Sequence, residues 1–143
     1  MRPNLRKFVS IFTALTIFLG LTMQAGAVTY ASDYFWRTRV WATRQGNGEF
    51  IVEYDIVATD FMDDLGASVI FIMEEQSDGD FEVAYTFESE DMPELIEHDV
   101  DVAYGCVTYE GTPGTRYYAT FGLYAKNSQG NETRYFDTNT ITA

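Results

Sequence analysis

Residues 115–126 read Thr-Arg-Tyr-Tyr-Ala-Thr-Phe-Gly-Leu-Tyr-Ala-Lys, and an apolar residue occupies every second position from residue 117 onward. Successive side chains of a β-strand point to opposite faces, so this alternation predicts a strand with one buried face. No segment of 11 or more residues after residue 27 has the periodicity of an amphipathic helix. The residues expected in the core are Tyr117, Ala119, Phe121, Leu123 and Ala125.

Six further alternating runs flank this segment, and turn residues separate them. Asp78-Gly79 is a strong hairpin signal because glycine accepts the positive φ that such a turn requires. Seven strands with one apolar face each are expected to stack as two antiparallel sheets, so the fold class is all-β. The six runs are residues 36–44, 49–59, 67–75, 81–88, 97–109 and 131–142.

Alternation within the other runs predicts which side chains are buried. In the second run Tyr54 shares an apolar face with residues 50, 52, 56 and 58, and we expect it in the core. In the run 81–88, positions 81, 83, 85 and 87 form the apolar face. In the run 97–109, Val102, Tyr104 and Cys106 oppose acidic residues, so Cys106 is expected to be a small buried hydrophobe.

Two segments resemble a fibronectin type III or related immunoglobulin-like domain: Gly-Thr-Pro-Gly-Thr-Arg-Tyr at 111–117 and Ala-Lys-Asn-Ser-Gln-Gly at 125–130. The resemblance implies an immunoglobulin-like sandwich in which the Tyr117 hydroxyl bonds to upstream backbone, forming a tyrosine corner. The sequence departs from the family at Tyr54, where a core tryptophan is usual. The chain also resembles small secreted proteins of Gram-positive, gut-type bacteria, which implies fold and location but no activity.

The first 27 residues have the layout of a secretory signal. Residues 1–7 carry three positive charges, residues 8–23 are uncharged and mostly apolar, and Ala25 and Ala27 form a small-x-small cleavage site. We therefore expect a signal-peptide helix over 1–27, and a secreted, extracellular domain over 28–143 with no membrane attachment after cleavage. The alternative is an uncleaved anchor, although a run of 16 residues falls short of the roughly 20 that span a bilayer.

The predicted exported part is strongly acidic. Residues 1–27 hold three of the nine Lys and Arg residues and none of the 22 acidic ones, which leaves six bases, 22 acids and a net charge of −16. Such a charge repels nucleic acid and anionic membranes, and it favours cations, basic proteins or neutral ligands. Cys106 is the single cysteine, so no internal disulfide forms.

The residue inventory argues against an enzyme. The one histidine, His98, lies between two acidic residues and is expected to be an exposed edge residue, while Cys106 is expected to be buried. One histidine and one buried cysteine do not make a nucleophile–base pair with a known local signature. They are also too few to anchor a zinc ion.

Calcium is the metal that the sequence could accommodate. Asp60, Asp63, Asp64, Glu90 and Asp91 would collect at one pole of an immunoglobulin-like sandwich, where several loops supply carboxylate oxygens. No spacing matches a known calcium loop, and the alternative is a solvated acidic pole that aids solubility.

Outward-facing tyrosines form the second candidate site. With Tyr117 pointing inward, Tyr118 and Tyr124 point outward, and Tyr135, Ile70 and Ile72 are expected to share that outer face. Exposed rings form a platform for a partner protein or for sugars, although tyrosine is also common on solvent faces of sheets. The sequence thus favours a non-enzymatic module for protein–protein interaction or adhesion at the bacterial surface, with carbohydrate binding and calcium binding as alternatives. It leaves the extracellular protein or glycan and the oligomeric state open.

Overall fold

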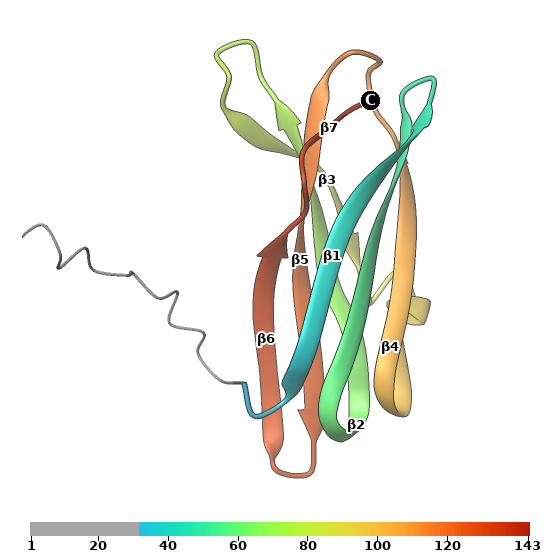
Figure 1. Cartoon of the computed structure of the whole chain (residues 1–143), viewed down its shortest axis with the longest axis vertical. Helices are drawn as coiled ribbons and strands as arrows, with labels where there is room; N and C mark the ends of the chain where they lie inside the picture. The colour runs from blue at the N-terminus through green and yellow to red at the C-terminus, as the bar shows by residue number, and fades with distance from the viewer. Residues whose placement is uncertain (1–31) are drawn as a thin grey trace, which may run out of the picture. The chain divides into compact units, whose positions relative to one another are not determined.

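Antiparallel strands make up most of the structure, a computed structural model that describes residues 32–143 (Figure 1). The predicted signal peptide and its helix lie outside the described residues. Residues 32–143 contain no α-helix, which confirms the all-β prediction, and no helix there has the length and apolar content needed to span a membrane. The elements are β1 (Phe35–Gly46), β2 (Glu49–Glu75), β3 (Phe81–Glu88), the short 3₁₀ helix η1 (Pro93–Leu95), β4 (Ile96–Glu110), β5 (Arg116–Asn127), β6 (Gly130–Asp137) and β7 (Ile141–Thr142).

The strand boundaries differ from the predicted runs at two places. The runs 49–59 and 67–75 belong to one strand, β2, and the last run is divided into β6 and β7. The division occurs at Thr138, whose backbone N–H donates to the carbonyl of Ala119 while its Oγ1 accepts from the Ala119 N–H. The hydroxyl of Thr138 thus takes the place of a backbone carbonyl in pairing with β5, at the point where the regular hydrogen bonding between β5 and β6 ends.

All seven strands belong to a single curled sheet, and β2 is its centre. The first half of β2 pairs with β1 and β4, and the second half pairs with β3 and β5, which in turn pairs with β6. Figure 1 shows β2 descending, bending and running back upward. The predicted separation into two sheets is not confirmed, because the β2–β4 ladder continues from Glu49–Glu110 to Gly66–Ile96 around this bend.

The curled sheet encloses the hydrophobic core. The rings of Phe50 and Tyr117 lie with centroids 5.1 Å apart, and those of Tyr54 and Phe121 lie 5.9 Å apart, although the first half of β2 is not hydrogen-bonded to β5. The first half of β2 therefore packs face to face with β5. The two faces predicted from alternation in 49–59 and 115–126 are confirmed, because all of these residues are buried: Phe50, Val52, Tyr54, Ile56, Ala58, Tyr117, Ala119, Phe121, Leu123 and Ala125.

Alternation gave the wrong face for the second half of β4. Ala103 and Val107 are buried, whereas Val102, Tyr104 and Cys106 are exposed. The register with β2 explains this, because Val102, Tyr104 and Cys106 pair with Val57, Asp55 and Glu53, which alternate with the buried residues of β2 and face outward. The prediction of a buried Cys106 is therefore wrong.

Small inward-facing residues on β4 make room for Tyr54. A side chain at Gly105 would collide with the Tyr54 ring, so the glycine allows the ring to lie flat against β4. The Tyr54 hydroxyl donates a 2.8 Å hydrogen bond to the backbone carbonyl of Leu95. Burial raises the pKa of Tyr54 above its ordinary value, and the nearby Glu97 charge adds to this effect. The prediction that Tyr54 is a core residue is confirmed.

The apolar face predicted for β3 is not a buried one. A register shift between Ile72 and Met73 pairs Tyr85 with the inward Ile72 and pairs Val83 with the outward Met73. This irregularity places Tyr85 on the inner side and Val83 on the outer side of an edge strand. Their exposed fractions are 51% and 55%, because β3 pairs with β2 alone and nothing else covers it.

Candidate functional site

Apolar side chains cover the outer face of the half of the sheet formed by β3, the second half of β2, β5 and β6. The register places Met73 beside Tyr118 and Val83, and the ring of Phe81 meets that of Tyr118 with centroids 4.9 Å apart. Tyr135 is 61% exposed and lies over Gly122 together with Val69. We call this the outer aromatic surface, and its residues are Val69, Phe71, Met73, Phe81, Val83, Tyr118 and Tyr135.

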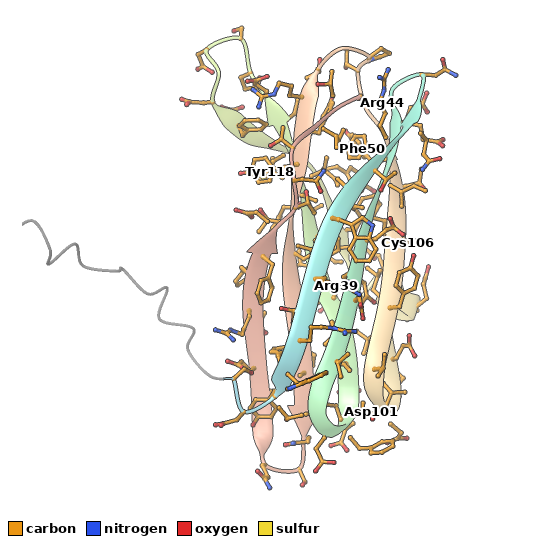
Figure 2. All side chains as sticks on the ribbon, viewed as in Figure 1. Arg39, Arg44, Phe50, Asp101, Cys106 and Tyr118 are labelled. Carbon is orange, nitrogen blue, oxygen red and sulfur yellow. The ribbon has the colours of Figure 1, made fainter. Side chains whose placement is uncertain are left out.

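The three tyrosines predicted to face outward do so, whereas the two isoleucines predicted to share their face point into the core. Tyr118 and Tyr124 are half-buried on the outer face and Tyr135 is exposed there, whereas Ile70 and Ile72 are fully buried in the core. The run 67–75 is apolar on both faces, so its alternation did not reveal which side chains point inward. Figure 2 shows Tyr118 and Cys106 on opposite sides of the molecule.

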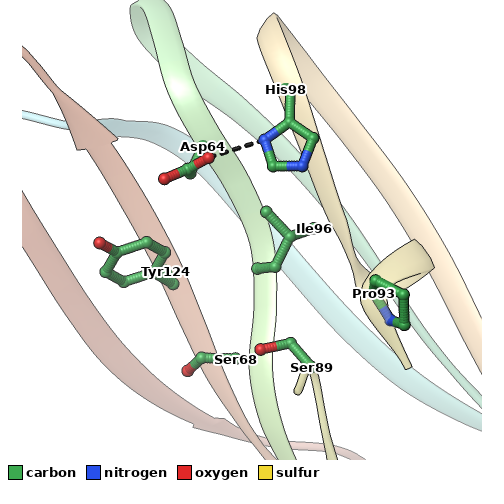
Figure 3. A pocket seen from close by; sticks show the side chains of 7 residues that line it. All are labelled: Asp64, Ser68, Ser89, Pro93, Ile96, His98 and Tyr124. Carbon is green, nitrogen blue, oxygen red and sulfur yellow. Dashed lines mark hydrogen bonds and ion pairs between the residues drawn. The ribbon is translucent and has the colours of Figure 1, made fainter. Parts of the chain in front are cut away.

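A pocket of about 390 Å³ opens on the same outer face (Figure 3). Its lining comes from four segments that are far apart in the sequence: β2, the turn and η1 helix after β3, the start of β4, and β5. The lining residues are Asp64, Ser68, Ser89, Pro93, Ile96, His98 and Tyr124.

A glycine in the middle of three paired strands brings two of the lining residues opposite each other. Gly66 pairs with Ile96 of β4 on one side and with Tyr124 of β5 on the other. Ile96 and Tyr124, which both line the pocket, are thus neighbours across Gly66. A side chain on Gly66 would also collide with the carbonyl of Leu95, so the close approach of β4 to β2 requires glycine here.

The charged residues at the pocket lie on the same three strands, two residues before Gly66 on β2. Asp64 lies between His98 of β4 and Lys126 of β5. Its Oδ1 is 2.7 Å from Nδ1 of His98, and its Oδ2 is 3.6 Å from Nζ of Lys126. The one acidic side chain of the lining is thus shared between two bases, so the pocket has little net charge compared with the rest of the surface.

Several polar atoms in the pocket are available to a ligand. Within residues 32–143, the hydroxyls of Ser89 and Tyr124 and the Nε2 atom of His98 make no hydrogen bond. The Ser68 hydroxyl donates to the carbonyl of Gly122 at 3.0 Å and keeps its acceptor lone pairs. Four of the lining residues could not be predicted from the sequence, because none belongs to a motif and only strand pairing brings them together: Ser68, Ser89, Pro93 and Ile96.

The five residues predicted to bind calcium do not converge. Within the described part of the chain, no three His, Cys, Asp or Glu residues lie close enough to hold a metal ion. Asp60 and Asp63 are exposed at the bend of β2, and Asp64 is engaged by two bases. Glu90 and Asp91 lie in a turn that the Ser89 N–H ties to the carbonyl of Ser68, several residues along β2 from the bend.

The outer face of β1, the first half of β2 and β4 is more polar than the outer aromatic surface. Asp55 pairs with Arg39 at 2.6 Å and with Arg37 at 3.4 Å. The Tyr104 hydroxyl donates to the Glu53 carboxylate at 2.6 Å, and this hydrogen bond raises the pKa of Tyr104 to about 12. Charged and apolar side chains therefore alternate on this face.

The expected hydrogen bond between the Tyr117 hydroxyl and upstream backbone is present. The Tyr117 hydroxyl accepts the backbone N–H of Thr112 at 3.0 Å, five residues upstream, and donates to the Glu74 carboxylate at 2.7 Å. Burial and the bond to Glu74 raise the pKa of Tyr117. Tyr117 therefore connects the β4–β5 turn to β2 and has a structural role.

Comparison with known proteins adds no relative to these observations. No protein-family description matches the chain, and no curated protein is significantly similar to it.

Proposed function

We propose that the chain is a secreted, non-enzymatic module that acts by protein–protein interaction or adhesion at the bacterial surface, and that the outer aromatic surface is its binding face. One observation carries this proposal. Seven apolar side chains on β2, β3, β5 and β6 form a continuous surface that includes the exposed Val83 and Tyr135. Large contiguous apolar patches are rare on monomers and commonly mark sites where another protein binds.

The distribution of charge favours this surface over the opposite one. Val102 and Tyr104 are exposed on the opposite face to a similar degree, but the ion pairs of Asp55 and the Tyr104–Glu53 bond interrupt that face. On the outer aromatic surface, the Arg116–Glu75 pair lies at one end, and Arg116 stacks near the Phe81 ring. A partner thus meets an apolar centre with charges at its border, which is the usual anatomy of an interface.

The net charge restricts the kind of partner. All 22 acidic residues of the chain lie in residues 32–143, together with six basic ones. A partner whose contact patch is apolar with a basic border would be attracted, and an acidic partner would be repelled.

We further infer that the curled sheet is an immunoglobulin-like sandwich whose two layers are continuous through β2 and β4. The contacts of Phe50 with Tyr117 and of Tyr54 with Phe121 support this inference, as does the Tyr117–Thr112 bond. The basic, apolar and small-residue segments of 1–27 support export of the domain.

The test is a pair of matched surface variants. In Val83→Glu/Tyr135→Ser, an exposed valine and an exposed tyrosine of the outer aromatic surface are replaced; in Val102→Glu/Tyr104→Ser, the same residue types are replaced on the opposite face. Each purified protein is immobilised and exposed to surface extracts of its own bacterium and of the host epithelium. We expect wild type and the second variant to retain a common partner, and the first variant to lose it.

Retention of that partner by both variants, or its loss in both, would place binding elsewhere and contradict the proposal. Circular dichroism of both variants must match wild type, which separates a lost surface from a lost fold. Salt dependence adds an independent criterion, because attraction between the acidic domain and a basic border weakens as ionic strength rises.

A further inference from the structure

We propose that the pocket between Ile96, Tyr124 and His98 is a binding site for a neutral saccharide ring. This site is separate from the protein-binding surface and does not depend on it. The proposal rests on three properties of the pocket: its size, the kinds of groups that line it, and its charge.

The size fits one or two sugar rings. The volume of about 390 Å³ is near the lower end of the range of small-molecule pockets, which is roughly 300–1,000 Å³. The pocket is open to solvent, so a ring at the end of a longer glycan can enter without any movement of the strands.

The lining combines apolar surface with free hydrogen-bonding atoms. Ile96 and Pro93 supply aliphatic contacts, and the Tyr124 ring supplies an aromatic face for the C–H groups of a pyranose. Around them lie the hydroxyls of Ser89 and Tyr124 and the Nε2 of His98, none of which has a partner within residues 32–143. The two hydroxyls both donate and accept, and the Nε2 of a neutral His98 accepts when Nδ1 donates to Asp64, so sugar hydroxyls find donors and acceptors here.

The charge of the pocket excludes ionic ligands. A carboxylate or phosphate ligand would approach a domain with 22 acidic and six basic residues, and the two nearest bases already pair with Asp64. A cationic ligand would need an unpaired carboxylate, and Asp64, the one acid in the lining, is paired with His98 and Lys126. A neutral polyhydroxylated ligand is not repelled by the acidic domain, and it needs no unpaired carboxylate in the pocket.

The site is tested by nuclear magnetic resonance titration with methyl glycosides of glucose, galactose, mannose and N-acetylglucosamine. We expect one or more of them to shift amide signals of Ser68, Ser89, Ile96 and His98 in a saturable way. Ser89→Ala should weaken binding about two- to tenfold, the range that corresponds to one hydrogen bond. Tyr124→Ala should weaken it by about tenfold or more, because both the ring contact and a hydroxyl are lost.

The matched control is Tyr135→Ala, which removes the same residue type from the same outer face but outside the pocket. It should bind the glycosides like wild type. The proposal is overturned if no neutral glycoside shifts the pocket signals at millimolar concentration, if glucosamine or glucuronic acid binds more tightly, or if Ser89→Ala binds unchanged. Loss of the protein partner in Val83→Glu/Tyr135→Ser has no bearing on these outcomes, so the two proposals fail independently.

Discussion

Replacing Tyr117 with phenylalanine removes one hydroxyl from a ring that is 1% exposed and otherwise leaves the packing intact. That hydroxyl accepts from the N–H of Thr112 and donates to the carboxylate of Glu74. Thr112 is exposed, so water can satisfy its N–H after the change, and the loss of this bond costs about 0.5 kcal/mol. The bond to Glu74 is charge-assisted, and hydrogen bonds to charged groups contribute about 1.5–3 kcal/mol. Glu74 is half-buried and partly solvated, so we take about 1.5 kcal/mol for this bond.

We therefore expect Tyr117→Phe to lower the free energy of unfolding by about 2 kcal/mol. With a urea m-value of about 1–3 kcal/mol/M for a domain of this size, the midpoint of urea unfolding should fall by roughly 1 M with an unchanged slope. The assay is equilibrium unfolding followed by circular dichroism and by tyrosine fluorescence, and the two probes should give coincident transitions.

Tyr109→Phe is the matched control. Tyr109 belongs to the same ring cluster, with its centroid 6.0 Å from that of Tyr117 and 5.6 Å from that of Phe50, but its hydroxyl makes no hydrogen bond within residues 32–143. Its replacement should change the free energy of unfolding by less than about 0.5 kcal/mol. Equal effects of the two substitutions would refute the assignment of a stabilising role to the Tyr117 hydroxyl.

Three further predictions test particular features of the fold. Gly105→Ala should lower the free energy of unfolding by about 1–3 kcal/mol, because the added methyl group collides with the Tyr54 ring; an unchanged melting temperature would contradict this packing. Cys106 is exposed, so a thiol reagent such as Ellman's reagent should modify it fully under native conditions, and modification that requires denaturant would show that the cysteine faces the core after all. Tyr104 should ionise with a pKa of about 12, since its bond to Glu53 favours the protonated phenol, and the difference in absorbance titration between wild type and Tyr104→Phe separates it from the other tyrosines. The stabilisation from that bond is present below the ordinary pKa of 10 and is lost as the pH rises through 12; Glu53→Gln should return the pKa toward 10.

Local alternation predicted the strands well where each strand has one apolar face. In β5 every inward residue was identified, because Thr120 and Gly122 interrupt the outer face while every inward position is apolar. The turn at Asp78-Gly79 followed from chemistry confined to a few residues, and Gly79 has the expected positive φ of 89°. Features that depend on one or two neighbouring residues were thus accessible from the sequence.

Alternation failed where pairing with another strand changes the register. Pairing with β2 places Val102, Tyr104 and Cys106 on the outer face of β4, and the shift between Ile72 and Met73 divides the faces of β3. In both cases the irregularity is set by the partner strand, β2, and not by the residues of the strand itself. A run such as 67–75, apolar on both sides, gives no internal evidence of which face is covered, and this explains the error at Ile70 and Ile72.

The pocket was beyond prediction for a further reason, which links it to the core. The Tyr54 hydroxyl reaches the carbonyl of Leu95 only because Gly66 has no side chain to hold the start of β4 away from β2. The close approach of β4 also brings Ile96 opposite Tyr124 across Gly66, and both side chains line the pocket on the outer face. The hydrogen bond of Tyr54 and the position of Ile96 in the pocket lining therefore both depend on one glycine. It follows that a substitution at Gly66 would displace part of the pocket lining and destabilise the fold at the same time.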